Sequence, residues 1–131
     1  MTDSTDGQPG PAPDAVELAH ALFDLARAGE AERLAAYVDA GAPVDLTDPA
    51  GNTLLMLAAY HGHPSTVSAL ADRGADVDRL NDRGQSPLAG AIFKGEDAVV
   101  ATLLEHGADP DAGQPTPRDT ATMFGRDDLL P

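Results

Sequence analysis

Two histidines one residue apart, His61 and His63, are the first residues whose types and spacing could do chemistry. Imidazole nitrogens bind zinc and other transition metals, so an H-x-H pair could begin a metal site. Such a site needs further ligands, and the sequence offers neither a cysteine nor a third ligand at useful spacing. We therefore predict no metal and no cofactor.

Three acidic pairs could supply a general acid and a general base. They are Glu96-Asp97, Asp127-Asp128 and Asp76 with Asp78. The first two pairs follow a glycine that opens a helix, where negative charge offsets the helix dipole. The third pair recurs as Asp109 and Asp111, as part of a repeated segment. The sequence has no Ser/His/Asp arrangement, phosphate-binding loop or dinucleotide glycine motif, and we predict that the protein is not an enzyme.

The elements that position these residues repeat every 33 residues, because Gly41-Ala42 recurs as Gly74-Ala75 and as Gly107-Ala108. Laying residues 41–73 over 74–106 gives ten identities, all but one at glycine and apolar positions. A period of this length is typical of a solenoid, in which each unit buries its apolar face against its neighbours.

Each unit carries the same order of local signals. A turn such as Asp48-Pro-Ala-Gly51 comes first, followed by a hydroxyl residue that can cap a helix. These cap residues are Thr53, Ser86 and Thr116, and proline follows the second and third of them. Nine residues after each cap stands a glycine suited to a left-handed helix stop, at positions 62, 95 and 125. A second helix then ends at Gly74 or Gly107.

This order, with G-x-T/S-x-L-x-x-A-A/I-x-x-G and a closing G-A-D-x-x, resembles the ankyrin repeat over residues 14–131. The resemblance implies an all-α repeat solenoid of helix pairs joined by β-hairpin-like loops. We expect four units, 14–40, 41–73, 74–106 and 107–131, with degenerate terminal caps, after a disordered tail at 1–13. It also assigns His63 to the start of a second helix rather than to a metal site.

The sequence departs from the family pattern at two positions that help to hold the repeats together. Met56, Ala89 and Asp119 replace the histidine of the family's Thr-Pro-Leu-His motif, which weakens a hydrogen-bond network. Arg118 occupies the register position of Leu55 and Leu88, so we expect the last unit to pack loosely and to fray first.

Proteins of this family bind partners on a concave surface made by the hairpin tips and the outer ends of the first helices. Tyr60, Phe93 and Met123 form one column on that surface, and aromatic residues and methionine are favoured in interfaces. An alternative is that these side chains cover the flank of the stack or pack against the hairpins. The predicted partner-binding residues are Pro49, Ala50, Asn52, Tyr60, His61, Leu80, Asp82, Arg83, Gln85, Phe93, Lys94, Met123 and Phe124.

The net charge of −14, from 22 acidic and eight basic side chains, disfavours nucleic acid as a partner. The chain has no apolar run of membrane-spanning length. We expect a monomeric cytoplasmic adaptor that binds another protein, with basic partners favoured, from a GC-rich bacterium or a salt-loving source. Two alternatives are a regulator that occludes a neighbouring enzyme or toxin, and a self-associating structural unit.

Overall fold

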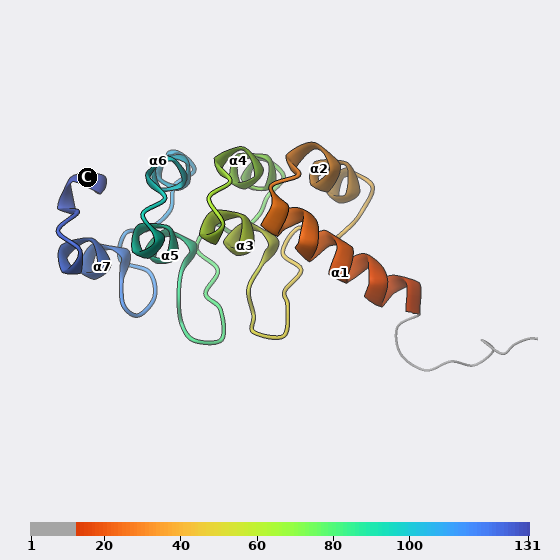
Figure 1. The fold of residues 1–131 in the computed structure, drawn as a ribbon, viewed down its shortest axis with the longest axis horizontal. Helices are drawn as coiled ribbons and strands as arrows, with labels where there is room; N and C mark the ends of the chain where they lie inside the picture. Colours follow the sequence, from red (N-terminus) through yellow and green to blue (C-terminus); the bar gives the residue numbers. More distant parts are fainter. Residues whose placement is uncertain (1–12) are drawn as a thin grey trace, which may run out of the picture.

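The computed structural model describes residues 13–131, which form helix pairs stacked side by side (Figure 1). The predicted tail, apart from Pro13, lies outside the described residues. The elements are α1 (Pro13–Ala28), α2 (Ala31–Asp39), α3 (Leu54–Tyr60), α4 (Pro64–Asp72), α5 (Pro87–Lys94), α6 (Asp97–Glu105), α7 (Pro117–Met123) and the 3-10 helix η1 (Asp127–Leu129).

The helices form two rows. Helices α1, α3, α5 and α7 pack consecutively in one row, and α2, α4 and α6 pack in the other (Figure 1). The long loops before α3, α5 and α7 project from the same side of the first row (Figure 1). The first of these loops carries an antiparallel bridge between Thr47 and Thr53, a minimal hairpin. The predicted all-α repeat solenoid is confirmed.

Local capping explains where the first-row helices begin. The side-chain oxygens of Thr53, Ser86 and Thr116 accept the backbone N–H three residues ahead, at 3.1, 3.1 and 3.0 Å. Each bond satisfies one of the N–H groups that a helix N-terminus leaves without a partner. The predicted caps are confirmed, and the three helices therefore start in the same register.

The helices of the first row also end as predicted. Gly62, Gly95 and Gly125 have φ angles of 80°, 72° and 66°, in the left-handed region that favours glycine. The N–H of the residue after Gly62 then bonds back to the carbonyl of Ala58 at 2.9 Å. This geometry turns the chain sharply into the second helix of the pair.

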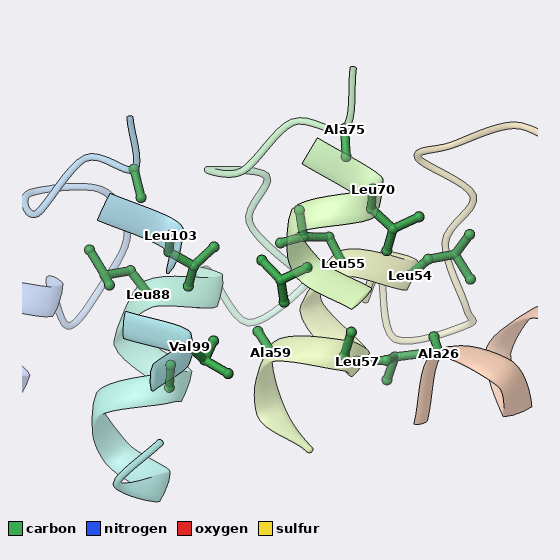
Figure 2. Close-up of a cluster of buried hydrophobic side chains, with 14 of the residues drawn as sticks. Ala26, Leu54, Leu55, Leu57, Ala59, Leu70, Ala75, Leu88, Val99 and Leu103 are labelled. Carbon is green, nitrogen blue, oxygen red and sulfur yellow. The ribbon is translucent and has the colours of Figure 1, made fainter. Parts of the chain in front are cut away.

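The core lies between the two rows. Leu55 and Leu70 of one pair and Leu88 and Leu103 of the next are fully buried, and Figure 2 shows them in a continuous layer of side chains. Small residues such as Ala59 lie between the leucines and let neighbouring helices approach closely. The apolar core therefore fixes the first-row helices against each other.

The last unit differs from the inner ones. Arg118 is exposed, and its Nε donates to Asp111 Oδ1 at 3.1 Å. Helix α7 packs on α5 and on η1, which supplies one short turn where the inner units have a second α-helix. The position that is buried as Leu55 and Leu88 in the inner units thus faces solvent here, where an arginine fits without strain.

Candidate protein-binding groove

Three exposed side chains lie at equivalent places in successive first-row helices. Tyr60 closes α3, Phe93 is next to last in α5 and Met123 closes α7. Each follows its cap residue by seven positions, so equal capping places all three at one end of their helices. Their exposed fractions are 40%, 59% and 67%, which is high for large apolar side chains.

A groove with a volume of about 580 Å³ runs between this column and the loops before the helices. Eight of the thirteen predicted binding residues line it. They are Ala50, Asn52, Tyr60, Arg83, Gln85, Phe93, Met123 and Phe124. The structure therefore brings loop residues and helix ends of three units to one surface.

Aromatic contacts hold the helix-end side of the groove. The Phe93 and Phe124 rings meet edge to face, with centroids 5.6 Å apart and an interplanar angle of 74°. Lys94 Nζ lies 4.5 Å from the centroid of the Tyr60 ring, within cation–π range. These contacts connect neighbouring units and leave part of each apolar side chain exposed.

Asn81 organises the loop side. Its Nδ2 donates to Asn52 Oδ1 at 3.0 Å and to Gln85 Oε1 at 2.9 Å, which links two successive loops. Its Oδ1 accepts the N–H groups of Arg83 and Gln85, both at 3.0 Å. Because the loops are hydrogen-bonded internally and to each other, the groove is formed before any partner arrives.

The other five predicted residues do not line this groove. Pro49 lies in a second hollow of about 590 Å³, against α1. His61 and Lys94 lie beside Tyr60, whereas Leu80 and Asp82 belong to the loop before α5. The backbone N–H of Asp82 donates to the carbonyl of Ala50 at 3.0 Å, which joins that loop to the preceding one.

Sequence reasoning missed eight residues that line the groove. They are Met56, Leu57, Asn81, Ser86, Ala89, Gly90, Pro115 and Thr120. The repeat pattern predicts Ser86 as a helix cap and gives Met56 and Ala89 as departures from the family motif, but it indicates a binding role for none of the eight. Gly90 did carry a signal, since glycine is unfavourable inside a helix and α3 has Leu57 at the same register position.

The histidines and acidic pairs take part in local contacts. His63 Nε2 lies 2.7 Å from the carbonyl oxygen of Arg27, near the end of α1. The His61 ring meets Tyr60 edge to face, and burial together with the charge of Lys94 lowers its pKa. Asp97 bonds Arg126 at 2.9 Å. Within residues 13–131, no three His, Asp or Glu side chains gather in a way that could hold a metal ion.

Asp128 is part of the same cluster, because Arg126 Nε also donates to its Oδ1 at 3.2 Å. This hydrogen bond lowers the pKa of the Asp128 carboxyl.

Of the helices in the described part of the chain, none has the length and apolar character that a membrane crossing requires.

Comparison with known proteins gives two findings. Residues 22–114, more than half of the chain, match a family model described as ankyrin repeats in three copies. The chain is also 46% identical over 67 residues to a Pseudomonas aeruginosa protein whose name describes it as an ankyrin repeat protein. That match covers 51% of this chain and 38% of the length of the relative.

Proposed function

Because the chain belongs to the ankyrin repeat family, we propose that it is a small adaptor that binds a partner protein in the groove between its loops and first-row helix ends. Ankyrin repeats are generally protein–protein interaction modules. The observation that carries the proposal is the column of Tyr60, Phe93 and Met123, which exposes apolar surface in three successive units.

The surface of the groove is apolar and is held in place by the fold. Removal of apolar surface from water favours association. The loops and helix ends are already fixed by hydrogen bonds and by the core, so little conformational entropy is lost when a partner binds. A groove of this kind favours binding over catalysis, because its lining is mostly apolar and amide side chains.

Removing the aromatic side chains tests the proposal. A partner is first captured from the native cell with the wild-type chain, identified and purified. We expect the Tyr60→Ala/Phe93→Ala double variant to bind it at least about 30-fold more weakly, as for the loss of about 2 kcal/mol at an interface hot spot. Isothermal titration calorimetry measures the dissociation constant.

Tyr37→Ala is the matched control, because Tyr37 in α2 has a similar exposed fraction of 38% but lies in the other row. This control should bind as the wild type does. Equal affinity of the double variant and the wild type would rule out the groove as the binding site.

A further inference from the structure

The floor of the groove contains a glycine that the fold does not require. Gly90 lies in the middle of α5 and does not have a positive φ. A Cβ atom there would meet only Tyr60 Cδ1, at the ordinary contact distance of 3.7 Å. Glycine weakens a helix relative to alanine, and α3 carries Leu57 at the equivalent position. The missing side chain therefore leaves a space in the groove that is bounded by the Tyr60 ring.

This space lies next to two exposed rings. Phe93 follows Gly90 by three positions and so lies on the same face of α5. Tyr60 approaches Gly90 from the neighbouring helix α3. We call Gly90, Tyr60 and Phe93 the Gly90 notch. Its walls are two aromatic side chains, and their apolar character suits an apolar side chain of a partner.

The charges at the groove are opposite in sign to those of the whole chain. Among residues 13–131, Arg83 is the one charged residue that lines the groove. Lys94 does not line it but lies over the ring of Tyr60, which does. Neither takes part in an ion pair within that range, whereas Arg73, Arg118 and Arg126 each bond an aspartate. In a chain with 22 acidic residues, the lining of the groove thus contains an arginine and no carboxylate, and the carboxylate of Asp82 lies outside the lining in the same loop as Arg83.

We infer that the groove binds a peptide segment of its partner in which a large apolar side chain fills the Gly90 notch and a nearby Asp or Glu pairs with Arg83. This inference rests on the proposed function and specifies the chemistry of the partner. An arginine fork and a carboxylate form a charge-assisted hydrogen bond, which is stronger beside an apolar surface than in bulk water.

The inference departs from the basic partner that the net charge favours. Net charge acts at long range and is screened over about 10 Å at 0.1 M salt. Groups in contact are governed by the local charges instead, here Arg83 and Lys94. The partner segment is therefore apolar with one or two carboxylates rather than uniformly acidic.

Selection from a random peptide library displayed on phage, against the immobilised full chain, tests this chemistry. Recovered peptides should be enriched in Leu, Ile, Phe or Trp together with a neighbouring Asp or Glu, relative to the unselected library. The best peptide is then synthesised with a fluorescent label, and its dissociation constant is measured by fluorescence polarisation.

Three variants test the assigned residues. Gly90→Leu, which fills the notch with the residue found in α3, should weaken the peptide at least tenfold without lowering the melting temperature. Gly90→Ala is a smaller change with the same direction, in case Leu disturbs Tyr60. Arg83→Gln should weaken the peptide about tenfold, and Arg79→Gln, at an exposed arginine outside the groove, should leave it unchanged.

A charge exchange checks the pairing itself: Arg83→Glu should lose binding, and a peptide with Lys in place of its acidic residue should recover it. Enrichment in Lys and Arg, recovery of no peptide, or full binding to both Gly90→Leu and Arg83→Gln would overturn the inference. If peptides fail to bind Tyr60→Ala/Phe93→Ala but bind the Gly90 and Arg83 variants fully, the inference is wrong and the proposed function still stands. Peptides insensitive to every groove variant would contradict both.

Discussion

At the scale of single residues, aspartates that follow the repeated Gly-Ala pairs join one unit to the next. Asp45 Oδ1 accepts the N–H of Asp76 at 3.1 Å, and Asp78 Oδ1 accepts the N–H of Asp109 at 2.9 Å. Asp76 and Asp109 also accept an N–H two residues ahead, at 3.0 and 2.8 Å. Their role in the structure is that of backbone hydrogen-bond acceptors.

The hydrogen bond from the Asp109 N–H to Asp78 holds the Asp78 carboxylate where burial and neighbouring charges disfavour its ionised form. Burial raises the pKa of its carboxyl, the N–H of Asp109 lowers it, and the charges of Asp109 and Asp76 raise it further, with a net upward direction. A folded-state pKa above the unfolded one means that folding disfavours the ionised form. The wild type therefore loses stability as pH rises through the pKa of the folded state.

Asp78→Asn removes this charge and keeps the oxygen that accepts the Asp109 N–H. We expect the variant to be more stable than the wild type at pH 7 by about 0.5 kcal/mol, the scale of partly exposed charges. The difference should vanish at pH values below the unfolded-state pKa, where the wild-type carboxyl is protonated in both states. Urea unfolding at several pH values measures it. The account would be contradicted if the free energy of unfolding of the variant, relative to that of the wild type, were lower at pH 7 than at low pH.

At the scale of elements, the same register position has different roles in inner and terminal units. Leu55 and Leu88 are fully buried two residues after their caps, whereas Arg118 at that position of α7 is exposed. The difference arises because the inner helices α3 and α5 pack between two first-row neighbours, whereas α7 packs on one of them and on η1.

Alanine substitutions at this position should separate the two roles. Leu88→Ala deletes a fully buried side chain and should lower the free energy of unfolding by about 2–5 kcal/mol. Arg118→Ala loses an exposed ion pair with Asp111 and should change the free energy of unfolding far less. Urea unfolding followed by circular dichroism measures both. Similar costs at the two positions would show that α7 buries this position in solution.

The sequence predicted the helix starts and stops because these depend on local chemistry. Thr53 caps α3 and Gly62 stops it through bonds within a few residues, and such bonds have a sequence signature. The column at Tyr60 and Phe93 was likewise predicted, since both residues follow their cap residue by seven positions.

Other features of the groove had weaker signals. Asn81 looks like an ordinary turn residue, because its link to Asn52 crosses from one unit to the next. Gly90 contributes by the absence of a side chain, and only the neighbouring Tyr60 shows that the vacant space lies in the groove. Contacts between repeats and unfilled space depend on the packed stack, so one sequence did not reveal them.

At the scale of the whole molecule, excess negative charge opposes folding and self-association. The described residues contain exposed ion pairs such as Arg27 with Asp24 and Arg73 with Asp39, and exposed pairs of this kind contribute little to stability. With 22 acidic and eight basic side chains, most carboxylates have no basic side chain to offset them. Repulsion among them is therefore the larger electrostatic term.

Salt should accordingly stabilise the fold. Raising NaCl from about 0.01 M to about 1 M shortens the screening length from about 30 Å to about 3 Å. Repulsion and attractive pairs are both weakened, but the repulsive pairs are more numerous. We expect the melting temperature to rise by at least about 3 °C, or about 1 kcal/mol for a domain of this size. Calorimetry across a salt series measures the change.

A charge-reduced variant separates screening from the general effect of salt on apolar surface. Glu17→Gln/Glu105→Gln removes two exposed charges in α1 and α6 that form no ion pair among residues 13–131. If repulsion is the cause, this variant melts higher than the wild type at low salt and gains less from added NaCl. Equal salt responses of the two proteins would show that salt acts on apolar burial instead.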